Sequence, residues 1–131
     1  MAIQHSHLPF LDACARHGLI GSPTWARGST SADLFWARYD VEYVDFDLNE
    51  DATVQVGLTA PLPQELRHGA ATVLEAGTLE HIFDLGSALR TADEMIRPGG
   101  AFVALVPVSW WNHGFVNLNP RLLAGFAAAN G

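Results

Sequence analysis

The chain has 131 residues, of which 49% are hydrophobic and 16% are charged, which suits one domain with a sizeable core. Its formal net charge is -7, and its basic residues are all scattered arginines, so no basic stripe offers partners to phosphates. This pattern argues against nucleic acid as a partner, and no apolar run reaches the ~18 residues of a membrane span.

The first predicted element is a helix over residues 7–20, where apolar side chains recur at helical spacing before a stop at Gly18. Cys14 lies on the apolar face of this helix and is interpreted as a core residue. As the only cysteine it has no internal disulfide partner, which fits a reducing compartment. The N-terminal segment lacks the basic start and apolar stretch of a signal peptide, so a cytoplasmic location is expected.

Strands and helical or turn segments then alternate along the rest of the chain. Apolar or alternating runs predict strands over residues 22–29, 41–48, 54–58, 71–79 and 101–108. The segments between and after them are predicted as helices or turns over residues 30–40, 60–69, 84–96 and 120–131. The "RPGG" run at residues 97–100 is expected to end the helix predicted over residues 84–96. Residues 109–119 are expected to form an aromatic loop. Alternation of this kind predicts βαβ units and a parallel sheet in an α/β domain that spans residues 1–131.

The stretch "ATVLEAGTLEHIFDLGSALRTADEMIRPGGAFVALVP" resembles the class I S-adenosylmethionine-dependent methyltransferases. In that family a strand often ends in "LEH", a helix follows, and "PGG" precedes an apolar strand; here these elements are residues 79–81, 97–100 and 102–106. The later "NHGF" is similar to a segment in one branch of the family. The resemblance implies a Rossmann-like fold with about five mostly parallel strands in the order 3-2-1-4-5. The two strands that usually complete the family's sheet are missing, so we expect a homodimer or a partner subunit to cover the open edge.

The resemblance also implies a binding site for S-adenosylmethionine at the carboxyl ends of the strands. The residues that match the family's cofactor positions are Gly28 after the first strand, Asp47 at the end of the second, and Ala76, Gly77 and Thr78 at the end of the fourth. The implied activity is methyl transfer to a small-molecule acceptor. Ala26 stands where the family has an acid, which favours the alternative of a repurposed fold: other His/Glu or metal-dependent chemistry, or a non-catalytic partner subunit.

Glu80 and His81 are open to three interpretations. Glu80 caps the following turn while His81 packs as a polar corner, or His81 is a general base supported by Glu80. The third interpretation comes from the small-RNA 2′-O-methyltransferases, whose "E-x-x-E-H" run and later histidine form a divalent-metal site. Glu80, His81 and His113 are similar to three of those ligands, and Gly77 replaces the first glutamate. His81 and His113 are also the candidate bases, with Glu80 in support.

Aromatic side chains surround His113 in the sequence. Trp110, Trp111 and Phe115 follow the last predicted strand, at the edge where a parallel sheet binds its ligands. They are interpreted either as a wall for a planar or apolar substrate or as packing against the core or a partner.

Overall fold

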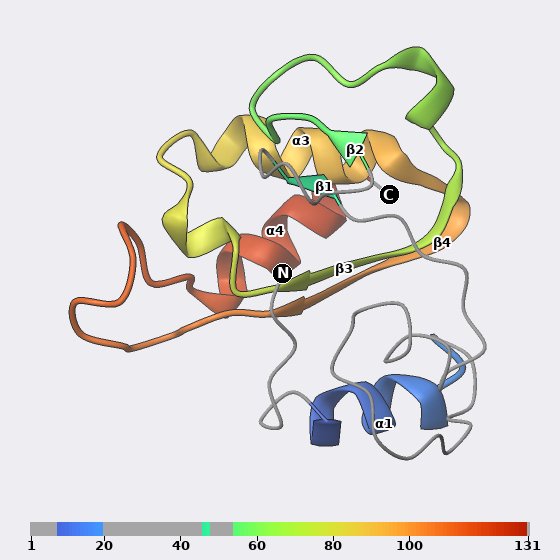
Figure 1. Cartoon of the computed structure of the whole chain (residues 1–131). Coiled ribbons are helices and arrows are strands. Elements are labelled where there is room, and N and C mark those ends of the chain that lie inside the picture. Colours follow the sequence, from blue (N-terminus) through green and yellow to red (C-terminus); the bar gives the residue numbers. More distant parts are fainter. Residues whose placement is uncertain (1–7, 20–45, 48–53, 131) are drawn as a thin grey trace, which may run out of the picture. The chain divides into compact units, whose positions relative to one another are not determined.

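The structure is a computed structural model that describes residues 8–19, 46–47 and 54–130 (Figure 1). The chain divides into two compact units, Met1–Gly57 and Leu58–Gly131, and each is described by itself. The predicted strand at residues 22–29, the predicted helix at residues 30–40 and the candidate cofactor residue Gly28 lie outside the described residues.

Helix α1 (Leu8–Arg16) in the first unit confirms the predicted helix with a glycine stop. Gly18 has a φ of 69°, and the amide of Leu19 donates to the carbonyl of Cys14 at 2.9 Å, which closes the helix end as a Schellman motif. Cys14 is buried, as predicted, and burial raises the pKa of its thiol. A buried thiol of raised pKa is a core residue rather than a nucleophile.

Two short strands complete what is described of the first unit. Strand β1 (Phe46–Asp47) pairs in parallel with β2 (Val54–Gln55), with Phe46 opposite Val54. Both residues of β1 lie within the strand predicted over residues 41–48.

The second unit is built around a βαβ arrangement. Strand β3 (Ala70–Ala76) leads through the short 3-10 helix η4 (Leu79–His81) into helix α3 (Leu85–Met95), and β4 (Ile96–Leu105) returns parallel to β3. Figure 1 shows β3 and β4 side by side with α3 alongside them. The predicted turn or helix at residues 60–69 contains the 3-10 helix η3 (Gln64–Leu66), and the predicted last helix is α4 (Pro120–Asn130).

Helix α3 begins at a capping residue and buries one face. The side chain of Asp84 accepts hydrogen bonds from the amide of Ser87 at 3.1 Å and from its hydroxyl at 2.7 Å. Ala88 and Leu89 of α3 pack into a core cluster with Leu79 and Leu118. Around the cluster lie partly buried side chains from α3, β4, α4 and the connecting segments: Leu58, Ile82, Leu85, Phe102, Val106, Val116, Leu123 and Phe126.

The "RPGG" run differs from its predicted role. Helix α3 ends at Met95, and Ile96–Gly100 already belong to β4, with an irregularity in the register between Ala70 and Thr72. Gly99 has a φ of 77°, and a Cβ on Gly100 would lie 2.8 Å from the carbonyl oxygen of Ala71. The glycines therefore allow the chain to pass from helix to strand against β3 without a separate loop.

The described residues confirm an α/β protein with parallel strand pairing, in two two-stranded sheets, β1–β2 and β3–β4. The order 3-2-1-4-5, the single domain over residues 1–131 and the covered sheet edge stay predictions. In the described part of the chain, no helix is both long enough and apolar enough to cross a membrane.

Candidate metal centre

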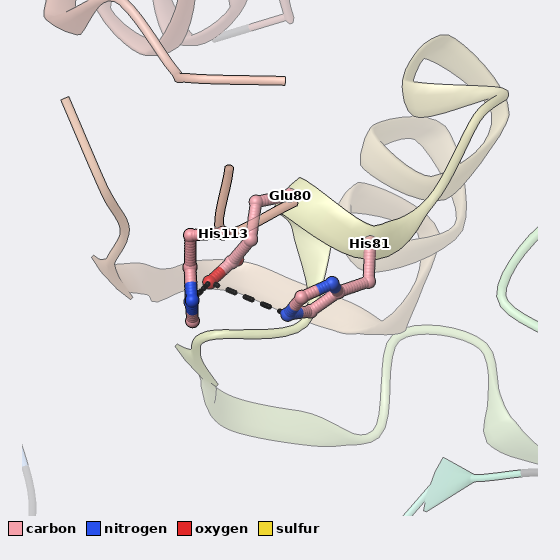
Figure 2. Close-up of side chains that lie close together, drawn as sticks. All are labelled: Glu80, His81 and His113. Carbon is pink, nitrogen blue, oxygen red and sulfur yellow. Dashed lines mark hydrogen bonds and ion pairs between the residues drawn. The ribbon is translucent and has the colours of Figure 1, made fainter. Parts of the chain in front are cut away.

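Glu80, His81 and His113 come together at the carboxyl ends of β3 and β4 (Figure 2). The Nε2 atom of His113 lies 3.2 Å from Oε1 of Glu80, and Nε2 of His81 lies 4.0 Å from the same oxygen. One nitrogen or oxygen from each of the three side chains lies within 4.8 Å of the others. Residues far apart in the sequence thus direct three metal-ligating atoms to one point.

The turn that presents Glu80 and His81 is held by a second carboxylate, Glu75. Its Oε1 accepts hydrogen bonds from the amides of Thr78 and, at 3.1 Å, of Leu79. These amides lie at the start of η4, where backbone donors have no partner within the helix. Gly77, with a φ of 88°, makes the sharp change of direction between β3 and η4. The side chain of one strand residue therefore fixes the geometry of the next turn.

The segment that carries His113 docks on the backbone of Glu80. The amides of Phe115 and Val116 both donate to the carbonyl of Glu80, at 2.7 and 3.3 Å. A Cβ on Gly114 would lie 2.5 Å from that carbonyl oxygen, so the close approach requires glycine. The aromatic loop is closed on itself by the amide of Trp110, which donates to Oδ1 of Asn117 at 2.9 Å.

Aromatic contacts hold the ring of His113. The Trp110 ring stacks on it with a centroid separation of 3.9 Å and an interplanar angle of 8°. The His81 ring meets it edge to face at 5.1 Å. The imidazole of His113 therefore lies between an indole face and a carboxylate, which restricts its orientation.

Burial at the site is uneven, and this bears on what it can bind. The side chain of Glu80 is 1% exposed, whereas His113 is 30% and His81 is 49% exposed. Oε2 of Glu80 and Oε2 of Glu75 are both buried and have no hydrogen-bond partner in the described part of the chain. Burial, the largest effect, raises the pKa of Glu75, and the nearby Glu80 acts in the same direction. A buried carboxylate with an unpartnered oxygen, beside two partly exposed imidazoles, favours a cationic ligand.

The donor set fits a divalent metal ion. Two imidazoles and one carboxylate are ligands of zinc and of other first-row divalent ions, and three protein ligands leave positions open for a substrate. The unpartnered Oε2 of the buried Glu80 offers a further ligand atom in the same side chain. The exposed side of His81 leaves a route for the ion to enter.

The structure decides one of the three interpretations of Glu80. Helix α3 is capped by Asp84, and the side chain of Glu80 points to His113 instead of capping a turn. The interpretation of Glu80 as a cap is therefore wrong. A role for His81 or His113 as a base stays a prediction, since both rings are close enough to Glu80 for either use.

The predicted cofactor residues fall into three groups. Ala76 is the last residue of β3, and the exposed residues Gly77 and Thr78 follow it directly. They lie beside the candidate metal cluster, since a Cβ on Gly77 would lie 3.4 Å from Oε1 of Glu80. Asp47 belongs to the first unit, and Gly28 lies outside the described residues. The binding of S-adenosylmethionine by these residues stays a prediction.

Sequence reasoning missed two residues that build the centre. Glu75 is the only acid in the mostly apolar strand 70–76, and a lone acid among apolar residues is the signal that could have identified it. Gly114 carried no such signal, because its role depends on the approach of another segment. Comparison of the chain with protein-family models, with curated proteins and with solved structures gives no match. The family resemblance thus depends on the sequence motifs alone.

Proposed function

We propose that the chain is a metal-dependent enzyme whose divalent cation is held by Glu80, His81 and His113. The observation that carries this proposal is the convergence of the three ligand atoms within 4.8 Å, with Glu80 buried and its Oε2 without a partner among the described residues. A divalent ion in such a set acts as a Lewis acid toward an oxygen of the substrate. Glu80 supplies the charge, and the histidines supply neutral nitrogen ligands.

The reaction that we propose is transfer of a methyl group from S-adenosylmethionine to an oxygen of a small-molecule acceptor. Support comes from the parallel βαβ unit, since ligands of such sheets lie over the carboxyl ends of the strands, where the metal cluster lies. The exposed backbone of Gly77 and Thr78 offers contacts for the cofactor there. In this proposal the chain's own residues position the acceptor, and positioning supplies most of the rate.

The alternative is the same metal centre without methyl transfer. It is favoured by Ala26, which stands where the family's first motif has an acid. A fold hosts many chemistries, so the βαβ unit is compatible with both reactions.

Calorimetric titration of the purified protein separates these proposals. The protein, freed of metal by a chelator, is titrated with zinc and with manganese, and each form is then titrated with S-adenosylmethionine and S-adenosylhomocysteine. Binding of metal and of both cofactor forms supports the methyltransferase. Binding of metal alone supports the alternative. A folded protein that binds neither contradicts both, and co-purification with another chain would then indicate a partner subunit.

A further inference from the structure

A pocket of about 440 Å³ opens between helices α3 and α4 of the second unit. This volume lies within the range of small-molecule sites, ~300–1,000 Å³. The lining residues come from the first two turns of both helices: Gly86, Leu89, Arg90, Arg121, Leu122, Gly125 and Phe126. None of them belongs to the candidate metal centre, so a ligand of this pocket would occupy a second site.

The wall of the pocket is apolar and is fixed by the core. Leu89 belongs to the buried core cluster, and Phe126 packs against that cluster. Leu122 lies on the other side of the division between core and solvent, since its side chain is 42% exposed. Gly125 leaves the wall open, because a Cβ there would meet nothing within 4 Å. The pocket therefore offers an accessible surface to a hydrocarbon group.

The charged side chains that line the pocket are both arginines, although the whole chain has a net charge of -7. Arg121 lies in the first turn of α4, where the helix dipole disfavours a cation. Its guanidinium has no hydrogen-bond or ion-pair partner in the described part of the chain. The stability of the helix therefore does not account for an arginine at this position, whereas an anionic ligand would.

Arg90 has acidic neighbours, but they do not neutralise the pocket. Its Nη2 donates to Oγ of Ser87 at 2.9 Å, and the two oxygens of the nearby Asp84 accept from the amide and the hydroxyl of Ser87. Asp84 and Arg90 form no ion pair within 4.0 Å. Asp93 and Glu94 follow Arg90 on α3, and neither lines the pocket. Arg90 thus keeps guanidinium N–H groups for an anion, while Ser87 restricts the position of its side chain.

We propose that the pocket between α3 and α4 binds a small amphipathic anion, with a hydrocarbon chain and an acidic head group, of which a fatty acid is the simplest example. The chain would lie on Leu89, Leu122 and Phe126, and the head group would accept hydrogen bonds from Arg90 and Arg121. This inference is independent of the metal centre, so its failure leaves the proposed function unaffected.

Calorimetric titration with three probes tests the inference. Octanoate carries both the chain and the charge, acetate lacks the chain, and octan-1-ol lacks the charge. We expect octanoate to bind at least about tenfold more tightly than acetate and roughly three- to tenfold more tightly than octan-1-ol. The titrations are made with a chelator present, so that a carboxylate cannot bind through a metal ion. Octanoate binding that requires zinc, or equal affinities for octanoate and octan-1-ol, would overturn the inference.

Variants of the two arginines locate the head group. Arg90→Gln and Arg121→Gln keep a polar side chain but remove the charge, and each should weaken octanoate binding roughly two- to fivefold, as for an exposed ion pair. The matched control is Arg97→Gln, because Arg97 is exposed and does not line the pocket. It should leave octanoate binding unchanged. An equal effect in all three variants would show that octanoate responds only to net charge, and would overturn the inference.

Nuclear magnetic resonance of the labelled protein locates the chain. Octanoate should shift the backbone amide signals of residues 86–90 and 121–126, and Leu122→Asn should weaken its binding. Shifts confined to other residues would overturn the inference. A second copy of the chain is the competing occupant of the pocket. In that case sedimentation would show a dimer that Leu122→Asn weakens and octanoate would not bind, which would overturn the assignment of a small anion.

Discussion

The Nε2 atom of His113 lies 3.2 Å from Oε1 of Glu80, although 33 positions separate the two residues in the sequence. The contact is possible because β3 and β4 are parallel, so the segments after the two strands emerge at the same edge of the sheet. A carboxylate–imidazole contact of this kind either orients a base or forms part of a metal site.

Loss of a single ligand should abolish tight metal binding. One of the three proposed ligands is removed in each of the variants Glu80→Gln, His81→Asn and His113→Asn. We expect zinc affinity to fall more than about 100-fold, which is a larger effect than the loss of a residue that only hydrogen-bonds to a ligand. Calorimetric titration measures this fall. His68→Asn is the control, because His68 is exposed and its Nδ1 lies 3.1 Å from the carbonyl oxygen of Ile96. A loss no larger in the three variants than in the control would contradict the assignment.

A methyl group at position 114 should separate the loop from its docking site. The Cβ of Gly114→Ala would lie 2.5 Å from the carbonyl oxygen and 2.9 Å from Cγ of Glu80, so the segment must move. We expect lower zinc affinity and a lower melting temperature. Gly125→Ala in α4 is the control: a Cβ there meets nothing within 4 Å, and alanine should stabilise the helix by about 0.5–1 kcal/mol. Similar zinc affinities in the two variants would disagree with the docking described above.

The stacked indole should tune the metal site without touching the ion. Trp110→Leu removes the ring that faces His113, and we expect zinc affinity to fall on the order of tenfold, as for other groups that orient a ligand. Trp111→Leu is the matched control, since that side chain is 92% exposed. Zinc should also change the tryptophan fluorescence of the Trp111→Leu protein and change it much less in Trp110→Leu. A zinc-dependent fluorescence change that remains in Trp110→Leu and is much smaller in Trp111→Leu would refute the stacking role of Trp110.

Glu75 should make the metal-free protein less stable as the pH rises. Burial raises the pKa of its carboxyl, so the folded state holds this proton at pH values where the unfolded state has released it. By linkage, the free energy of unfolding falls as the pH rises from the ordinary carboxyl range through the raised pKa, and then levels off. Glu75→Gln should remove this decline while keeping an acceptor for Thr78 and Leu79.

Urea unfolding at a series of pH values, in the presence of a chelator, measures this difference between the wild type and Glu75→Gln. The exposed Asp84 contributes with the opposite sign, because hydrogen bonds from Ser87 lower the pKa of its carboxyl, and its contribution cancels between the two proteins. Glu75→Leu, which removes the acceptor of both amides, should cost about 1–3 kcal/mol. A difference that stays constant with pH would show that the carboxyl does not titrate as described.

The three candidate ligands could be identified from the sequence through a resemblance between short motifs. Glu80, His81 and His113 were named together only because they resemble the metal ligands of the small-RNA 2′-O-methyltransferases. The parallel pairing of β3 and β4 gives the physical reason why the segments after the two strands meet. The glycine stop of α1 and the last helix from Pro120 were similarly readable, because each depends on local backbone preferences.

The remaining features depend on how side chains and backbone meet in the folded turns and strands, which the sequence pattern does not specify. Glu75 looks like an acid misplaced in a strand until its hydrogen bonds to Thr78 and Leu79 are seen. The extension of β4 back to Ile96 depends on how closely Gly100 approaches Ala71, and the stacking of Trp110 on His113 depends on the path of a loop.

The carbonyl of Glu80 accepts hydrogen bonds from the amides of Phe115 and Val116, so it would link occupancy of the candidate metal site to the opening of the loop. An ion bound by Glu80 and His113 would also hold the acceptor that these amides need, so local unfolding of residues 110–116 would have to release it. Hydrogen–deuterium exchange at the amide of Phe115 should slow as the zinc concentration rises, in proportion to saturation of the site. The exchange rate of the Phe115 amide proton would thus report whether the Glu80 side chain holds a metal ion.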